Sequence, residues 1–164
     1  MPHNIDVIIE DDRWVAFDLS ELALNAINAT LDFQNIDIAE ISLLGCDDRS
    51  IAVLNADFRG KSVPTNVLSW PNDDLKPFKN GDVPLQPKSD HTGIFTLGDI
   101  ALAYETCSRE ASEQNKKMTE HVTHLIVHGT LHLLGFDHVR DLDATRMEAL
   151  EVNILGSMGL SDPY

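Results

Sequence analysis

The pattern of hydrophobic and polar positions predicts that the chain begins with a strand and an amphipathic helix. The segment "IDVIIED" (5–11) is short and rich in β-branched residues, as strands are. Asp18, followed by Glu21 three positions later, forms a variant capping box that is expected to start the helix. The apolar residues of this helix recur at helical spacing: Leu19, Leu22, Ala23, Ala26, Ile27 and Leu31.

Strand and helix patterns continue to alternate along the rest of the chain. Strands are predicted over 39–46, 65–70 and 94–103, and helices over 47–60, 104–116, 119–134 and about 142–158. The 47–60 helix has acids in its first turn and Gly60 as its C-cap. The last helix is expected to bury Met147, Leu150, Ile154, Leu155 and Met158.

This order of elements predicts an α+β (mixed α/β) fold. We expect one domain over residues 1–164, with a mixed sheet of about four strands packed against about five helices. Residues 71–93 contain four prolines and two glycines, which is unusual for a connection inside a compact domain. That segment is interpreted as either a hairpin excursion or a mobile flap near a site.

Composition favours a protein of the reducing cytoplasm. No run approaches the roughly 18 apolar residues of a membrane span, and the first twenty residues lack the basic start of a secretory signal. The two cysteines, Cys46 and Cys107, lie far apart and form no Cys-x-x-Cys motif. They are expected to be buried thiols rather than a disulfide.

Charge restricts the kind of partner that the surface can bind. With 12 Lys+Arg against 27 Asp+Glu, the net charge of −15 disfavours nonspecific binding of polyanions over the whole surface. The segment "FRGKSVPTNVLSWP" (58–71) is a local exception, because positions 59–70 hold two cations and no acid. Arg59 at the end of a helix and Lys61 after it could bind phosphate, although Arg59 could instead only complement the helix dipole.

The segment "HGTLHLLGFDH" (128–138) lies at the end of a helix with one polar stripe. At 100° per residue, His121, His124, His128 and His132 fall within about 80° of one another, and the adjacent positions are apolar. A helix that is apolar nearly all round is buried. Four buried histidines could each form ordinary hydrogen bonds, but a shared metal ion satisfies several of them at once.

Spacing then selects the ligands. His128 and His132 are four residues apart, so their imidazoles can converge on one ion. Gly135 is expected to end the helix in a left-handed conformation, which turns the chain so that His138 returns to the ion. Three histidines and an open fourth position are typical of a catalytic zinc site. The motif therefore predicts a metalloprotease-like zinc helix.

The neighbours of these three histidines have less definite roles. His124 could support a ligand, act as an acid or base, or close the site as a fourth ligand. His121 is expected at the helix surface or in first-turn packing. Asp137 could orient a ligand imidazole, or it could be a solvated turn acid.

Gly129 occupies the position where metallopeptidases with this histidine frame carry their catalytic glutamate. Peptide hydrolysis must protonate a poor leaving amine, which needs a proton-shuttling acid. Cleavage of a phosphodiester depends more on charge neutralisation, which a metal and a nearby cation provide. The missing glutamate therefore favours phosphate chemistry and directs attention to Arg59.

Four segments in this order resemble the bacterial YbeY family of rRNA maturation factors: "FRGKSVPTNVLSWP", "LGDIALA", "HGTLHLLGFDH" and "MEALEVNILGSMGLSDPY". The resemblance runs from about residue 40 to the end. It implies a single-strand-specific endoribonuclease with one zinc ion per chain. The implied roles are maturation of ribosomal RNA, notably the 3′ end of the 16S RNA, and ribosome quality control.

Carried over residue by residue, the resemblance implies that His128, His132 and His138 bind the metal. Arg59 would bind phosphate and stabilise the transition state. Independently of the resemblance, the residues themselves suggest that Lys61 holds phosphoryl oxygens beside Arg59 and that His124 is the candidate acid or base. Implied partners are ribosomal RNA, the 30S subunit and its proteins, and a ribosome-assembly GTPase, with no membrane. Phe136 replaces the tyrosine of many family members, so a hydroxyl is not required there.

Two other functions remain open from the sequence. A metallopeptidase-like zinc hydrolase would use the same histidine frame, although Gly129 argues against it. A non-enzymatic assembly factor would hold zinc structurally and dock its acidic surface on basic ribosomal proteins. A fourth protein ligand on the metal would favour this second alternative.

Overall fold

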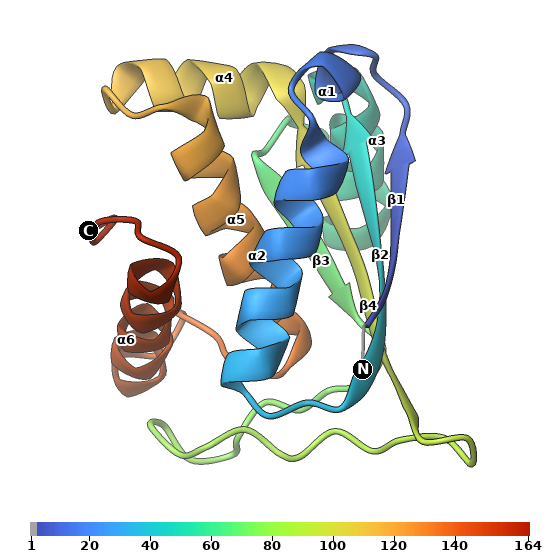
Figure 1. The fold of residues 1–164 in the computed structure, drawn as a ribbon, viewed down its shortest axis with the longest axis vertical. Helices are drawn as coiled ribbons and strands as arrows, with labels where there is room; N and C mark the ends of the chain where they lie inside the picture. Colours follow the sequence, from blue (N-terminus) through green and yellow to red (C-terminus); the bar gives the residue numbers. More distant parts are fainter. Residues whose placement is uncertain (1–2) are drawn as a thin grey trace.

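A four-stranded mixed sheet organises the chain in the computed structural model, which describes residues 3–164 (Figure 1). Its strands are β1 (Asn4–Ile9), β2 (Ile38–Cys46), β3 (Val67–Pro71) and β4 (Ile94–Ala103), in the order β1-β2-β4-β3. The first two neighbouring pairs are parallel, and β3 runs antiparallel to β4 at one edge. The predicted mixed sheet of four strands is confirmed.

Six helices surround this sheet, one more than the number expected. They are α1 (Arg13–Ala16), α2 (Leu19–Phe33), α3 (Asp48–Arg59), α4 (Tyr104–Glu113), α5 (Met118–Leu133) and α6 (Asp141–Ser157). The short α1 was not predicted. It is stabilised by a tertiary contact, because its fully buried Trp14 donates a hydrogen bond from Nε1 to the carbonyl of Cys46 at 2.9 Å.

The capping box predicted at the start of α2 is wrong. Asp18 adopts a left-handed conformation with φ of 61°, and its side chain makes no capping hydrogen bond. This left-handed residue joins α1, whose Trp14 contacts the end of β2, to the start of α2. In that conformation the Asp18 carboxylate does not reach the backbone N–H groups of the first turn.

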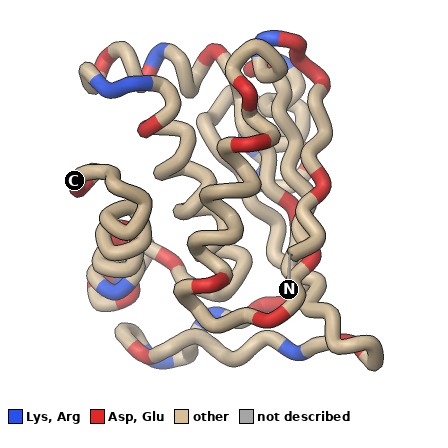
Figure 2. The backbone as a smooth tube through the Cα atoms, in the orientation of Figure 1, with Lys and Arg blue, Asp and Glu red and all other residues tan. Residues whose placement is uncertain are grey.

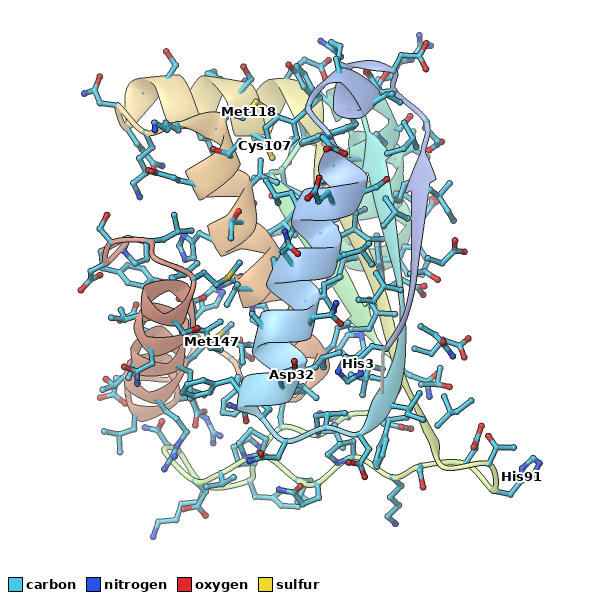
Figure 3. The ribbon with its side chains drawn as sticks, viewed as in Figure 1. His3, Asp32, His91, Cys107, Met118 and Met147 are labelled. Atoms are coloured by element: carbon cyan, nitrogen blue, oxygen red, sulfur yellow. The ribbon has the colours of Figure 1, made fainter. Side chains whose placement is uncertain are left out.

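The two faces of the sheet are covered unequally. Helices α2 and α5 pack on one face, with α6 outside them, whereas α3 covers the other face (Figure 1). Leu43 and Ile100 belong to the larger core on the first face, and Ala101 packs with Ile51 of α3 on the second. Met147 points from α6 towards the larger core (Figure 3). Helix α5 is therefore enclosed between the sheet and α6.

Helix α5 is buried as its sequence predicts. Ten of its residues are buried: His121, Val122, Thr123, Leu125, Ile126, Val127, Gly129, Thr130, Leu131 and Leu133. Gly129 faces the sheet, where a Cβ atom would meet side-chain atoms of Ile100 at 3.4 Å and of Val67 at 3.6 Å. These are ordinary van der Waals distances, so a Cβ would fit here, whereas a longer side chain would meet the apolar residues of β3 and β4.

Residues 72–93 connect β3 to β4 and pack against the start of α6. The segment is therefore the long connection of an antiparallel hairpin formed by β3 and β4. This agrees with the hairpin interpretation of residues 71–93. Asn80 Oδ1 accepts hydrogen bonds from the N–H groups of Leu142 (3.1 Å) and Asp143 (3.0 Å). Because the N-cap residue Arg140 makes no side-chain cap, Asn80 supplies this function from a distant part of the chain.

Replacing Asn80 with alanine is expected to destabilise the protein by about 1–2 kcal/mol, the usual effect of losing an N-cap. Urea unfolding of the variant measures this change as a lower midpoint with an unchanged slope. Gln86→Ala, on the same segment and exposed, is the matched control and should unfold like the wild type. Equal midpoints for the Asn80 variant and the wild type would contradict the role of Asn80.

Acidic residues are spread over much of the surface, whereas α5 contains only one charged residue, Glu120 (Figure 2). Cys46 and Cys107 are free and buried, as expected, and burial raises the pKa of Cys46 to about 12. Such thiols are unreactive at neutral pH. Within residues 3–164, no helix is both long enough and apolar enough to span a membrane.

Candidate metal centre

Three histidine side chains converge at the C-terminal end of α5. Nitrogen atoms of His128, His132 and His138 all lie within 4.8 Å of one another. The Nε2 atoms of His128 and His132 are 3.0 Å apart, and the His138 ring centroid lies 5.0 Å from that of His128 and 5.1 Å from that of His132. The structure therefore brings together the three histidines that the sequence predicted as metal ligands.

The turn after α5 returns His138 to the helix, and its hydrogen bonds form a Schellman motif. The N–H of Phe136 donates to the carbonyl of Leu131 at 3.1 Å, and the N–H of Gly135 donates to the carbonyl of His132 at 3.0 Å. Gly135 has φ of +97°, so the predicted left-handed stop is confirmed. Without this reversal His138 would continue along the helix axis, away from the other two rings.

The geometry and the protonation of these side chains suit a metal ion. Two ligands about 2.05 Å from a tetrahedral ion are separated by about 3.3 Å, close to the observed distance between the Nε2 atoms. Burial, and then the electrostatic effect of the neighbouring imidazoles of His128 and His138, lower the pKa of His132 to about 4. His132 is therefore neutral at pH 7 and keeps the lone pair that a metal requires.

Glu151 of α6 is a site residue that the sequence reasoning missed. Its side chain is 0% exposed, and its Oε1 atom lies 2.5 Å from Nδ1 of His128. Burial by itself would raise the pKa of Glu151, but hydrogen bonds from His124, His128 and Tyr164 together lower it to about 2. Glu151 is thus an ionised carboxylate held against one of the three histidines.

The sequence did contain a signal for Glu151. Position 151 belongs to the same helical stripe as Met147, Ile154, Leu155 and Met158, which were expected to be buried. An acid in such a stripe must be buried too, and a buried carboxylate needs a cation or hydrogen-bond donors. The partner is on α5, so the pairing depends on how the two helices pack.

His124 lies one turn before His128 and belongs to a second group of donors, with His128 and Glu151. Its Nε2 atom is 3.5 Å from Oε2 of Glu151 and 3.4 Å from the hydroxyl oxygen of Tyr164. Tyr164 also donates a short hydrogen bond to Oε2 of Glu151. His124 is thus connected to the three-histidine group through Glu151.

Asp137 does not take the role of orienting an imidazole. Its Oδ1 atom accepts the backbone N–H of His138 at 2.8 Å, and its Oδ2 atom lies 3.3 Å from Nζ of Lys76. It therefore stabilises the turn and fixes the backbone of His138, whereas Glu151 contacts the imidazole of His128.

The other histidines lie outside the three-histidine group. His121 is 4% exposed in the first turn of α5, with Nε2 at 2.9 Å from Glu110 Oε1, so the expected first-turn packing is confirmed. His3 lies beside Asp32, immediately before the start of β1, and His91 lies at the tip of the 72–93 segment (Figure 3).

The three-histidine group has no fourth protein donor among the described residues. Position 129, where the peptidases carry their catalytic glutamate, is a glycine. Within residues 3–164, no fourth His, Cys, Asp or Glu donor lies within 4.8 Å of all three histidine donors. Gly129 faces Ile100 and Val67, so the position of the peptidase glutamate adjoins apolar side chains of the sheet. Asp137 and Glu151, the carboxylates against this group, already have partners.

Arg59 and Lys61 lie around the edge of the sheet from the histidines. Arg59 is the exposed last residue of α3, which covers the face opposite α5, and Lys61 is exposed just after it. Phe58 is 63% exposed and packs edge-to-face on Trp70 of the edge strand β3 at 5.1 Å. The chain thus presents two cations and an aromatic side chain next to β3, which α5 contacts from the other face.

Comparisons with known proteins agree with this architecture. A family model described as "Endoribonuclease YbeY" matches residues 6–159. The protein "Endoribonuclease YbeY" of Ruegeria pomeroyi is 56% identical over 163 residues, covering 98% of each chain. That of Paracoccus denitrificans is 46% identical and covers 100% of this chain and 91% of the relative. The solution structure of TM1509 from Thermotoga maritima has the same fold, with a TM-score of 0.57, 20% identity and 97% coverage of both chains.

The agreement extends over nearly the whole chain rather than over the histidine motif alone. A short metal motif can arise in unrelated proteins, but a family match over residues 6–159 includes the sheet and the helices that position the motif. The chain therefore belongs to the YbeY family of endoribonucleases, which are hydrolases of phosphodiester bonds.

Proposed function

We propose that this protein is a zinc-dependent endoribonuclease that cleaves single-stranded RNA, with residues 1–164 forming one catalytic domain. The observation that carries the proposal is the group of His128, His132 and His138, which offers three imidazole nitrogen donors and has no fourth His, Cys, Asp or Glu donor among the described residues. Gly129 supports phosphodiester rather than peptide cleavage, because the peptidase base is missing.

Zinc fits the donor set best, because three imidazoles around an open tetrahedral position are its usual catalytic environment. When bound, it would supply a Lewis acid that neutralises charge developing on the scissile phosphate. His128 and His132 would hold the ion from helix α5, and His138 would complete the set from the turn. We expect one ion per chain.

The remaining chemistry is assigned to side chains of this protein. Arg59 and Lys61 bind phosphoryl oxygens of the RNA, and Arg59 also stabilises the transition state. His124 is the candidate for moving a proton during cleavage, because it is half-buried and one turn from His128 on the same helix stripe.

The arrangement around β3 explains how an acidic protein can bind RNA. A strand of RNA that crosses the β3 edge would contact the metal on one side and Arg59 and Lys61 on the other. Exposed Phe58, packed against Trp70, offers an aromatic surface on which an unpaired base can stack. Stacking of this kind requires bases that are not in a duplex, which favours single-stranded substrates.

Zinc-loaded protein should therefore cleave a single-stranded RNA and leave the same sequence intact when it is annealed into a duplex. Cleavage should stop when zinc is removed with a chelator and resume when zinc is restored. Products are resolved on a denaturing gel. Hydrolysis of a peptide library without RNA cleavage would instead support a metallopeptidase-like zinc hydrolase. Zinc binding without cleavage of RNA or peptide would support an assembly factor that holds zinc structurally.

Replacing Arg59 with alanine is expected to weaken RNA binding about tenfold and to lower the slope of log K against log salt by about one charge. Arg49→Ala is the matched control, because Arg49 is also exposed on α3 but lies at the opposite end of the helix. Binding is measured by fluorescence anisotropy with labelled RNA at several salt concentrations. Equal losses of RNA affinity in the two variants would show that Arg59 contributes only its positive charge and makes no specific contact.

We further propose that the substrate in the cell is ribosomal RNA, notably the 3′ end of the 16S RNA, with a role in ribosome quality control. The expected partners are the 30S subunit with its proteins and a ribosome-assembly GTPase in the cytoplasm, without a membrane. The net charge of −15 suits docking on basic ribosomal proteins. Co-sedimentation with purified 30S subunits at increasing salt tests this proposal.

A further inference from the structure

Glu151 and Tyr164 form a connected pair whose position the metal ligands alone do not explain. Glu151 is 0% exposed, on a helix whose other buried residues are mostly apolar. A buried carboxylate is costly unless hydrogen bonds and charges compensate for its lost hydration. Its two oxygens are engaged separately, Oε1 with Nδ1 of His128 and Oε2 with the hydroxyl of Tyr164.

The contact with Oε1 determines which nitrogen of His128 carries the proton. A carboxylate accepts a hydrogen bond, so Nδ1 of His128 must be the protonated nitrogen. Nε2 is then left with a free lone pair, and this is the nitrogen that faces Nε2 of His132 at 3.0 Å. Glu151 thus fixes both the tautomer and the orientation of His128, as carboxylates do behind metal-bound histidines.

The hydroxyl that contacts Oε2 of Glu151 belongs to Tyr164, the last residue of the sequence. Residues 161–164 fold back towards α5 and are held there by Nζ of Lys116, which donates to the carbonyl of Pro163 at 3.1 Å. Asp162 accepts the N–H of Tyr164 at 2.8 Å. The Tyr164 ring packs edge-on against His124, with 5.5 Å between centroids. These contacts place its hydroxyl on the carboxylate.

We propose that Glu151 and Tyr164 act together as positioning residues for His128, which makes residues 161–164 part of the metal centre. Glu151 orients the ligand ring, and Tyr164 orients Glu151 by occupying the oxygen that His128 does not use. The hydroxyl of Tyr164 holds Oε2, which also lies 3.5 Å from Nε2 of His124, and so keeps Oε1 on His128. This inference rests on the proposed metal site.

The test measures zinc affinity rather than activity. Purified full-length protein is stripped of metal and titrated with Zn²⁺ in competition with a colorimetric chelator. Glu151→Gln keeps the shape of the side chain but removes its charge, so zinc should bind about 10–100-fold more weakly. Tyr164→Phe removes only one hydroxyl and should weaken binding about three- to tenfold, a smaller effect because it acts through Glu151.

Matched controls separate positioning from general effects of the substitutions. Tyr104→Phe removes a hydroxyl from a tyrosine that packs on Trp14, and Glu21→Gln removes one charge from an exposed residue of α2. Both should bind zinc like the wild type. Melting temperatures of the zinc-free proteins show whether each variant is folded, and a merely structural role would lower these temperatures without changing the affinity.

The outcomes distinguish this inference from the function on which it rests. Wild-type protein that binds no zinc would overturn the proposed metal site. Wild-type protein that binds zinc, together with Glu151 and Tyr164 variants whose affinities stay within twofold of it, would overturn the positioning role alone. Reduced affinity in both variants, with unchanged affinity in both controls, would support it.

Discussion

Replacing His128 with alanine is expected to abolish RNA cleavage and stoichiometric zinc binding while leaving the protein folded. His128 is one of the three proposed ligands and is also the side chain that joins the histidine group to Glu151. Loss of a Lewis acid worth several kcal/mol in the transition state corresponds to a rate decrease of about 1000-fold or more. Zinc affinity should fall by at least about 100-fold, since removal of a supporting residue alone costs up to that much.

The measurements for His128→Ala are cleavage of single-stranded RNA and zinc content after gel filtration. His91→Ala is the control, because His91 is exposed at the tip of the 72–93 segment (Figure 3) and belongs to neither group of converging donors. It should retain full activity and one zinc ion. Cleavage by the His128 variant at the wild-type rate would point to a contaminating nuclease and would contradict the proposed mechanism.

Replacing Gly135 with alanine should destabilise the protein by about 2–5 kcal/mol and also weaken zinc binding. A residue with a Cβ in the left-handed region costs about 1–2 kcal/mol, and steric overlap adds about 1–3 kcal/mol. At Gly135 the Cβ would lie 2.6 Å from the carbonyl oxygen of Leu75, which is backbone and cannot rotate away. The turn must shift, and His138 shifts with it.

Gly93→Ala is the matched control for Gly135→Ala. Gly93 has φ of +85°, but a Cβ there would meet nothing within 4 Å, so this variant isolates the conformational cost. It should lose only about 1–2 kcal/mol and bind zinc normally. Urea unfolding and zinc titration give the two quantities. If both variants lose the same stability and keep the same zinc affinity, the contact with Leu75 has no influence on the site.

Periodicity predicted the elements well wherever local packing and backbone preferences agree. All four strands and five of the six helices follow from it, because strands alternate every two residues and amphipathic helices every three or four. The errors arose where tertiary contacts decide. Helix α1 depends on Trp14 reaching the carbonyl of Cys46, and Asp18 turns left-handed instead of capping α2.

For the site, the sequence by itself determined the three histidines. Their spacing on a helix and the glycine that ends it are local properties, and Gly135 adopts the left-handed conformation that its position suggested. The departure from the peptidase motif at Gly129 was also visible in the sequence. These features concern one helix and one turn, whose geometry follows from backbone rules alone.

Only the tertiary structure determined which side chains from other parts of the chain contact or neighbour the histidines. Glu151 comes from another helix, Tyr164 from the end of the chain, and the Asn80 cap of α6 from the excursion between β3 and β4. Arg59 lies on the helix that covers the opposite face of the sheet, a position that its neighbours in sequence did not reveal. Such contacts depend on how helices pack around the sheet, because hydrophobic burial fixes which faces meet but leaves no periodic signal for the individual partners.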